Sequence, residues 1–133
     1  MADQLYPKGK EKILRAQVNF DNDTIKAVLV SSDYAFAGAH EFLTHLGAAV
    51  VGEAVALANK SSVNGAFGAD DPLFLALPAG QTAKAMVVYK DTGVAGTSAL
   101  LGYFDNITGF PAVTNGGDLL VRISTGPYRL FSL

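Results

Sequence analysis

From residue 54 onward, the sequence is divided into short apolar or β-branched runs, each closed by a turn signal. Turns such as Asp70-Asp71-Pro72 and Asn115-Gly116-Gly117 separate them, because Asx, Gly and Pro residues favour turns. Short strands at this spacing are typical of antiparallel all-β domains. The sequence therefore predicts a mainly β fold, an antiparallel β-sandwich or barrel-like domain with one or two short helices in the N-terminal third. The candidate strands are 54–58, 61–67, 73–77, 83–90, 99–104, 119–124 and 128–133.

The face patterns of these runs differ. Segment 24–31 is β-branched and nearly all apolar, which predicts a strand covered on both faces. In 83–90, Lys84 and Lys90 lie opposite Ala85, Val87 and Tyr89, which predicts one buried and one solvated face.

Two segments are expected to be helical. Pro7 suits the first position of a helix, where its missing N–H costs nothing, and we expect a short helix over about 7–17 that passes into an extended segment. The alternation from Leu14 to Phe20 also fits a strand. Segment 39–47 is typical of a second helix that ends at Gly47.

Composition restricts the class of protein. The chain has 133 residues, of which half are hydrophobic and 17% are charged. This length corresponds to about one domain, and the hydrophobic content excludes intrinsic disorder. A net charge of −2 argues against a nucleic-acid-binding platform. The absence of cysteine excludes disulfides and thiolate metal sites. We expect no membrane contact, since no apolar run approaches ~20 residues, and no secretory signal.

Candidate groups for chemistry are few. His40 and His45 are five residues apart, which is not the i, i+4 spacing of a zinc-binding helix. Asp70-Asp71 precedes Pro72 and predicts a turn, because adjacent residues on a strand point to opposite faces. We therefore predict no catalytic residue, no metal and no cofactor, and expect that the chain is not an enzyme.

The N-terminal stretch is the main candidate for partner binding. We divide the chain into an N-terminal arm, 1–12, and a single β-rich domain, 13–133. The stretch is either a solvated helix face or a segment that docks on a partner, with apolar anchors and cations that steer the approach. Deletion of residues 1–12 is then expected to leave the fold intact and weaken binding. The candidate partner-binding residues are Leu5, Tyr6, Lys8, Lys10, Lys12 and Arg15.

Several segments occur in an order that resembles a loose group of small virion proteins of tailed bacteriophages. The resemblance extends over nearly the whole chain. In order, its segments are the strand Asp23-Thr24-Ile25-Lys26-Ala27-Val28-Leu29-Val30, Tyr34, the helix His40-Glu41-Phe42-Leu43, the turn Phe67-Gly68-Ala69-Asp70-Asp71 before Leu73 and Phe74, Val87-Val88-Tyr89-Lys90-Asp91-Thr92-Gly93, the turn Asn115-Gly116-Gly117-Asp118, and the last strand, 128–133.

The resemblance implies a structural component of a virion. We expect a capsid decoration (cement) protein that binds the major capsid protein or another virion protein, as a homo-oligomer such as a trimer, without contacting nucleic acid. Its expected location is the virion, the capsid surface first, after synthesis in the cytoplasm of the bacterial host. The alternatives are a tail-tube, tail-terminator or fibre-associated protein, and a carbohydrate-binding β-sandwich module.

Overall fold

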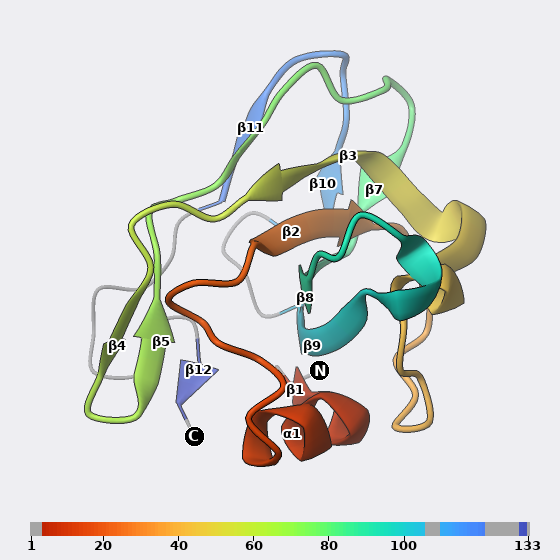
Figure 1. Cartoon of the computed structure of the whole chain (residues 1–133). Helices are drawn as coiled ribbons and strands as arrows, with labels where there is room; N and C mark the ends of the chain where they lie inside the picture. The colour runs from red at the N-terminus through yellow and green to blue at the C-terminus, as the bar shows by residue number, and fades with distance from the viewer. Residues whose placement is uncertain (1–3, 106–109, 122–130, 133) are drawn as a thin grey trace.

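A computed structural model of the chain describes residues 4–105, 110–121 and 131–132. Its centre is a five-stranded sheet in which all neighbouring strands run antiparallel (Figure 1). In spatial order, its strands are β1 (Gln4–Leu5), β9 (Ala99–Phe104), β8 (Ala85–Lys90), β2 (Ile25–Val30) and β3 (Val50–Ala56). The prediction of a mainly β, antiparallel fold is confirmed.

Three small antiparallel sheets and three helical segments complete the described structure. The small sheets are β10 (Ala112–Val113) with β7 (Thr82–Ala83), β11 (Leu119–Leu120) with β6 (Leu73–Phe74), and β12 (Phe131–Ser132) with β5 (Ala66–Gly68) and β4 (Ser61–Val63). The helical segments are α1 (Pro7–Leu14) and two 3₁₀ segments, η1 (Leu43–Ala49) and η2 (Ala95–Thr97). No helix among the described residues is long and apolar enough to cross a bilayer.

Strands β2 and β8 are covered on both faces. In β2, every residue except Lys26 is buried, as the apolar run predicted. In β8, residues 85–89 are all buried, so the predicted solvated face of 83–90 is wrong for this stretch. The reason is position, because β8 lies between β2 and β9 and has a core on each side.

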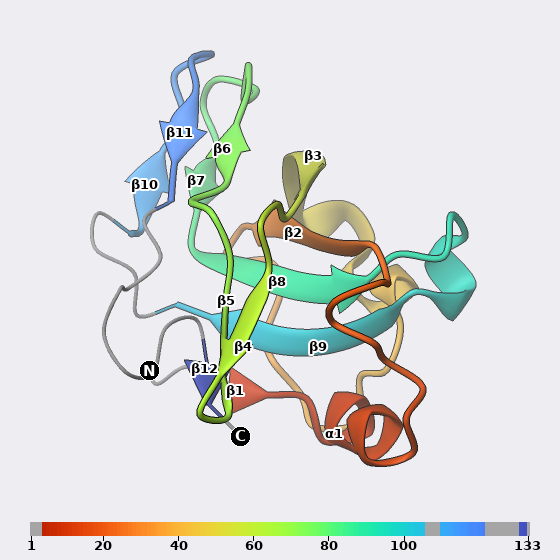
Figure 2. The same ribbon diagram turned by 60° about the vertical axis from the view of Figure 1, so that its left-hand side comes forward.

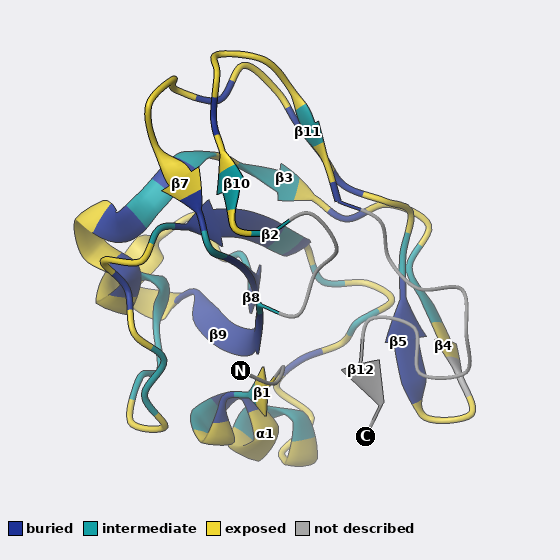
Figure 3. Ribbon diagram, turned by 180° about the vertical axis from the view of Figure 1, so that it is seen from behind, coloured by how far each residue is buried: buried dark blue, intermediate teal, exposed yellow. Residues whose placement is uncertain are grey.

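Each face of the sheet carries its own hydrophobic core, and Figure 3 shows β8 and β9 in the dark blue of buried residues. On one face, Leu29 and Met86 pack with Phe67 and Phe74 from the small sheets. The core residues of the other face are Tyr6, Val28, Val30, Tyr34, Leu46, Ala49, Ala85, Val87, Tyr89, Leu100 and Tyr103. Burial of apolar area at roughly 25 cal/mol per Å² makes these two layers the main stabilising contribution to the fold.

The segment predicted as one strand, 61–67, is instead a hairpin. Strands β4 and β5 pair around Asn64-Gly65, where φ is 50° and 81°. Positive φ at both central residues is the geometry of a two-residue hairpin turn, and Asn-Gly is its most favourable sequence. The Asn-Gly pair therefore divides the predicted strand into two.

Two other predicted boundaries move. The predicted helix 39–47 becomes η1, which begins at Leu43, and Gly47 interrupts it with φ 57° and ψ −135° instead of ending it. The strand predicted from residue 54 begins at Val50. Most of the last two predicted strands, namely 122–124 and 128–130 together with 133, lies outside the described residues.

The segment predicted as an arm lies against the sheet over its described residues. Gln4 and Leu5 pair with Tyr103 and Gly102, and the Tyr6 N–H donates to the carbonyl oxygen of Leu101 at 3.0 Å. The boundary predicted after residue 12 falls inside α1. Residues 4–14 are therefore part of the sheet and its covering layer, and they do not extend from it as an arm.

At the other end of the molecule, two segments pair along their length and project from the sheet (Figure 2). We call segments 72–83 and 112–121 the projecting ribbon. Backbone hydrogen bonds join the two segments along their length. Among them, the Val121 N–H donates to the Pro72 carbonyl oxygen and the Leu77 N–H donates to the Gly117 carbonyl oxygen, each at 3.0 Å. In both ribbon views, α1 lies at the opposite end from this ribbon.

Candidate interaction surfaces

The structure divides the six predicted partner-binding residues into two sets. Leu5 packs against a core, and Tyr6 is fully buried with 0% of its surface exposed. Lys12 lies over the Phe42 ring and pairs with Glu41 at 2.5 Å. The three residues that keep a charged group at the surface are Lys8, Lys10 and Arg15.

This placement reverses one expectation. Deletion of residues 1–12 would remove β1 and the Tyr6 ring from a core. We therefore do not expect the shortened chain to keep its fold, and a loss of partner binding by that variant would report only unfolding.

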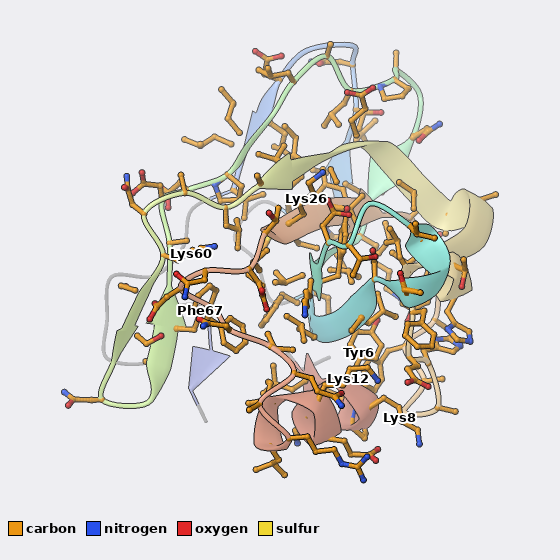
Figure 4. All side chains as sticks on the ribbon, in the orientation of Figure 1. Tyr6, Lys8, Lys12, Lys26, Lys60 and Phe67 are labelled. Atoms are coloured by element: carbon orange, nitrogen blue, oxygen red, sulfur yellow. The ribbon has the colours of Figure 1, made fainter. Side chains whose placement is uncertain are left out.

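Tyr6 belongs to a chain of hydrogen bonds that leads from the core to the surface. Its hydroxyl is 2.6 Å from the Tyr34 hydroxyl, which is 2.8 Å from His40 Nδ1. The His40 ring stacks on the His45 ring with centroids 5.0 Å apart. Figure 4 shows Tyr6 above α1, between the helix and the sheet. The geometry joins the N-terminal segment to the loop that follows β2.

The charge states of this chain follow from burial. Desolvation raises the pKa of the Tyr6 hydroxyl far above its usual range and also raises the pKa of Tyr34. Both hydroxyls are therefore neutral hydrogen-bonding groups at physiological pH. Burial, together with the nearby His45, lowers the pKa of His40 and favours its neutral form. We interpret this network as a structural contact that holds the N-terminal segment against the loop after β2.

Protonation of His40 is expected to destabilise the fold. The pKa of His40 in the folded state lies below its ordinary value of about 6.5. The stability that the fold gains from a neutral His40 is therefore complete above about pH 6.5. It falls as the pH drops below that value, because the unfolded chain then binds the proton more readily than the folded chain. The His40→Asn variant keeps a polar atom near Nδ1 but does not titrate. Between about pH 7.5 and 5.5, urea midpoints should therefore fall less for this variant than for the parent chain. Equal falls would contradict the role assigned to His40.

The outer face of α1 combines cations with one exposed apolar side chain. Leu14 is 86% exposed and lies one turn from Lys10, on the same side of the helix. Arg15 follows directly and is also exposed. Within the part of the chain that the structure describes, neither Lys10 nor Arg15 forms an ion pair. We call Lys8, Lys10, Leu14 and Arg15 the basic face.

The projecting ribbon carries most of the exposed apolar side chains of the described structure. Leu73, Leu75, Val113 and Leu120 are 43% to 75% exposed. Leu73 and Leu120 are direct cross-strand partners, and they alternate with Phe74 and Leu119, which pack on the core. Exposed apolar side chains that lie together are a candidate interaction site, and the cross-strand pair Leu73 and Leu120 fits that description.

Carboxylates precede the two strands that carry these apolar residues. Asp70 and Asp71 precede β6, and Asp118 precedes β11. The turn predicted at Asp70 is held by Asn59, whose Nδ2 donates to Asp70 Oδ2 at 2.5 Å. Between Lys60 and Lys84 the sequence has no Lys or Arg. The projecting ribbon and the two residues before it, Asp70 and Asp71, therefore carry negative charge.

A polar depression of about 310 Å³ lies where β2 ends. Its lining includes Ser31, Asp33, Gln81 and Thr82. In the described residues, no group of three or more His, Asp or Glu side chains is placed to hold a metal ion. The surfaces with a defined chemical character are thus the basic face and the ribbon.

Comparison with known proteins adds no relative. No protein-family model matches this sequence, and no curated protein matches it. The function is therefore argued from the surfaces of this chain and from the order of its sequence motifs.

Proposed function

We propose that this chain is a structural protein of a bacteriophage virion, a capsid decoration protein that binds the outer shell. The observation that carries the proposal is the projecting ribbon, whose apolar residues Leu73, Leu75, Val113 and Leu120 remain 43% to 75% exposed in this chain. The motif order that resembles small virion proteins of tailed phages supports the same assignment. In this proposal the partner is the major capsid protein.

In this proposal the protein acts mechanically, by stabilising the assembled shell through binding. A protein that binds the assembled shell and not the separated subunits stabilises the shell by mass action. A stable contact of this type buries about 1,200–2,000 Å² in total. On a shell the contact is repeated by symmetry, and several weak contacts made by one oligomer reinforce each other through effective concentration.

The fold fits this role through rigidity. A five-stranded sheet with a core on each face holds α1 and the ribbon at opposite ends (Figure 1). A rigid spacer of this kind transmits force between the bodies that it joins, because its packed core changes shape little.

Binding to purified heads tests the proposal. The full-length chain is mixed with empty heads of the phage that encodes it and sedimented. We expect pelleting that saturates at a fixed ratio to the major capsid protein, and heads that resist higher temperature. Pelleting with isolated tails instead would favour the tail alternative, and pelleting with neither would contradict a virion role.

A further inference from the structure

Two Asn-Gly sequences lie within the described structure, at Asn64-Gly65 and Asn115-Gly116, and all four residues are exposed. In an Asn-Gly sequence, the backbone nitrogen of the glycine can attack the side-chain amide carbon of the asparagine. Glycine permits this attack because it has no Cβ atom to obstruct a close approach of its backbone. The conformation of each site decides whether the attack takes place, and the two sites differ in conformation.

Asn115 has an open surrounding and a side chain that is folded back on the backbone. Asn115 and Gly116 lie in the loop between β10 and β11 and belong to neither strand. A Cβ atom added at Gly116 would meet nothing within 4 Å, so water reaches this site. The Oδ1 atom of Asn115 accepts a hydrogen bond from the Gly117 N–H at 3.0 Å. This Asx turn brings the amide carbon of Asn115 toward the nitrogen of the next residue.

The same hydrogen bond favours the reaction electronically. Attack on the amide carbon of Asn115 places negative charge on Oδ1, and a backbone N–H at about 3 Å stabilises an oxyanion of this kind. The Gly117 N–H is such a donor, at 3.0 Å from Oδ1. The loop therefore supplies both the attacking nitrogen and a group that stabilises the developing charge.

Asn64 is held in a conformation that opposes ring closure. Asn64 and Gly65 form the two-residue turn between β4 and β5, with φ of 50° and 81°. The residues on either side of the turn, Val63 and Ala66, are paired in the ladder. Ring closure requires the Asn64 backbone to rotate, and that rotation requires local opening of the hairpin. The hairpin therefore protects Asn64.

We propose that Asn115 is a site of spontaneous covalent modification, at which the chain converts this asparagine through a succinimide to aspartate or isoaspartate. The Gly116 nitrogen loses its proton to solvent base and bonds to Cγ of Asn115. The side-chain nitrogen takes up a proton and leaves as ammonia. Water then opens the ring. Attack of water at Cγ gives aspartate, and attack at the backbone carbonyl carbon gives isoaspartate.

The products change the charge and the backbone of this loop. Each product adds one carboxylate close in sequence to Asp118, whose Oδ1 already accepts a hydrogen bond from the Ala76 N–H at 2.8 Å. Isoaspartate also adds one atom to the backbone between Thr114 and Gly117, two residues that are hydrogen-bonded to segment 72–83. The inference goes beyond the proposed function, since it concerns the chain alone, whether or not a shell is bound.

Peptide mapping by mass spectrometry tests the proposal on the full-length chain, incubated in buffered water that is enriched in heavy oxygen. We expect the peptide that contains Asn115 to gain the mass of an amide-to-carboxylate conversion, with heavy oxygen incorporated. Conversion at Asn115 should be about tenfold or more faster than at Asn64, because Asn64 reacts only from the opened hairpin. In urea the two sites should react at similar rates, because unfolding removes the difference in conformation.

Two variants test the role of the Gly117 N–H. In Gly117→Ala, the added Cβ atom would lie 3.0 Å from Oδ1 of Asn115, so the side chain has to turn away from the N–H. Conversion at Asn115 should then slow several-fold, while conversion at Asn64 in the same chain stays unchanged. Asn115→Gln is the control, because it keeps an amide but has to close a larger ring, and position 115 should then stay unmodified.

The comparison with urea separates a local effect from unfolding. If Gly117→Ala opened the ribbon, conversion at Asn115 would move to the rate measured in urea, and thermal melting would show the loss of structure. Two results would overturn the inference: conversion at Asn115 in the folded chain that is no faster than at Asn64, and a folded Gly117→Ala variant that reacts as fast as the parent chain. Head binding enters neither measurement, so this inference and the proposed function are tested separately.

Discussion

The Tyr6→Ala variant is expected to lose about 3–5 kcal/mol of unfolding free energy, the range for removing a buried aromatic ring. Tyr6 is fully buried, and its ring contacts that of Phe36 with centroids 4.7 Å apart. Its hydroxyl also bonds Tyr34. Loss of the ring leaves a cavity beside β9 and weakens the attachment of α1. Chemical denaturation monitored by circular dichroism gives the measurement.

Tyr6→Phe is the matched control for this prediction. It keeps the ring and removes the hydroxyl, so the expected loss is about 1 kcal/mol, the usual net value of one hydrogen bond. Tyr34 retains His40 as a partner in that variant. If Tyr6→Ala were as stable as the parent chain, Tyr6 would not belong to the core, and the first residues would be an arm after all.

Gly9→Val is expected to detach α1 from the sheet and to cost about 3 kcal/mol, at the upper end for overpacking. A Cβ atom at Gly9 would lie 2.5 Å from the Leu100 carbonyl oxygen and 3.1 Å from Leu101 Cα. Both are backbone atoms of a central part of the sheet, so they cannot rotate away. The helix has to move, and Tyr6 moves with it. Denaturation and amide hydrogen exchange in β9 measure the effect.

Two alanine variants test whether an added side chain at Gly9 lowers or raises the stability of the fold. In an isolated helix Gly9→Ala would gain up to ~1 kcal/mol, but the backbone clash at 2.5 Å outweighs that gain, so we expect a net loss. At Gly96 an added Cβ meets nothing within 4 Å, and Gly96→Ala should leave stability nearly unchanged. A stabilised Gly9→Ala variant would contradict close packing of α1 on β9.

The sequence predicted the parts of the fold that depend on local pattern. The apolar run of β2 indicated cover on both faces, and turn residues marked the strand-rich region. The Asn64-Gly65 hairpin carried a recognisable signal, yet its apolar flanks matched one continuous strand. For β8, Lys84 and Lys90 suggested a solvated face, although they lie at or just beyond the strand ends and the residues between them are buried.

The candidate surfaces were less accessible to sequence reasoning. The lysines around α1 indicated a solvated arm, whereas Gly9 was the signal of close packing, because glycine inside a helix has an energetic cost and needs a reason. The exposure of Leu75 had no signal, because it lies in an apolar run that matches a core strand. For Leu120 the sequence did carry a signal, because it alternates with Leu119 and Val121, and the alternation predicts that Leu120 lies on the solvated face.

The location of the chain on virus particles tests the central claim most directly. Antibody raised against the recombinant chain is applied with gold conjugate to virus particles purified from the source of the chain, and the labelled particles are imaged by electron microscopy. Particles preincubated with excess free chain serve as the control. We predict gold over the surface of the heads. Gold confined to tails, or no labelling of intact particles, would contradict a capsid decoration protein.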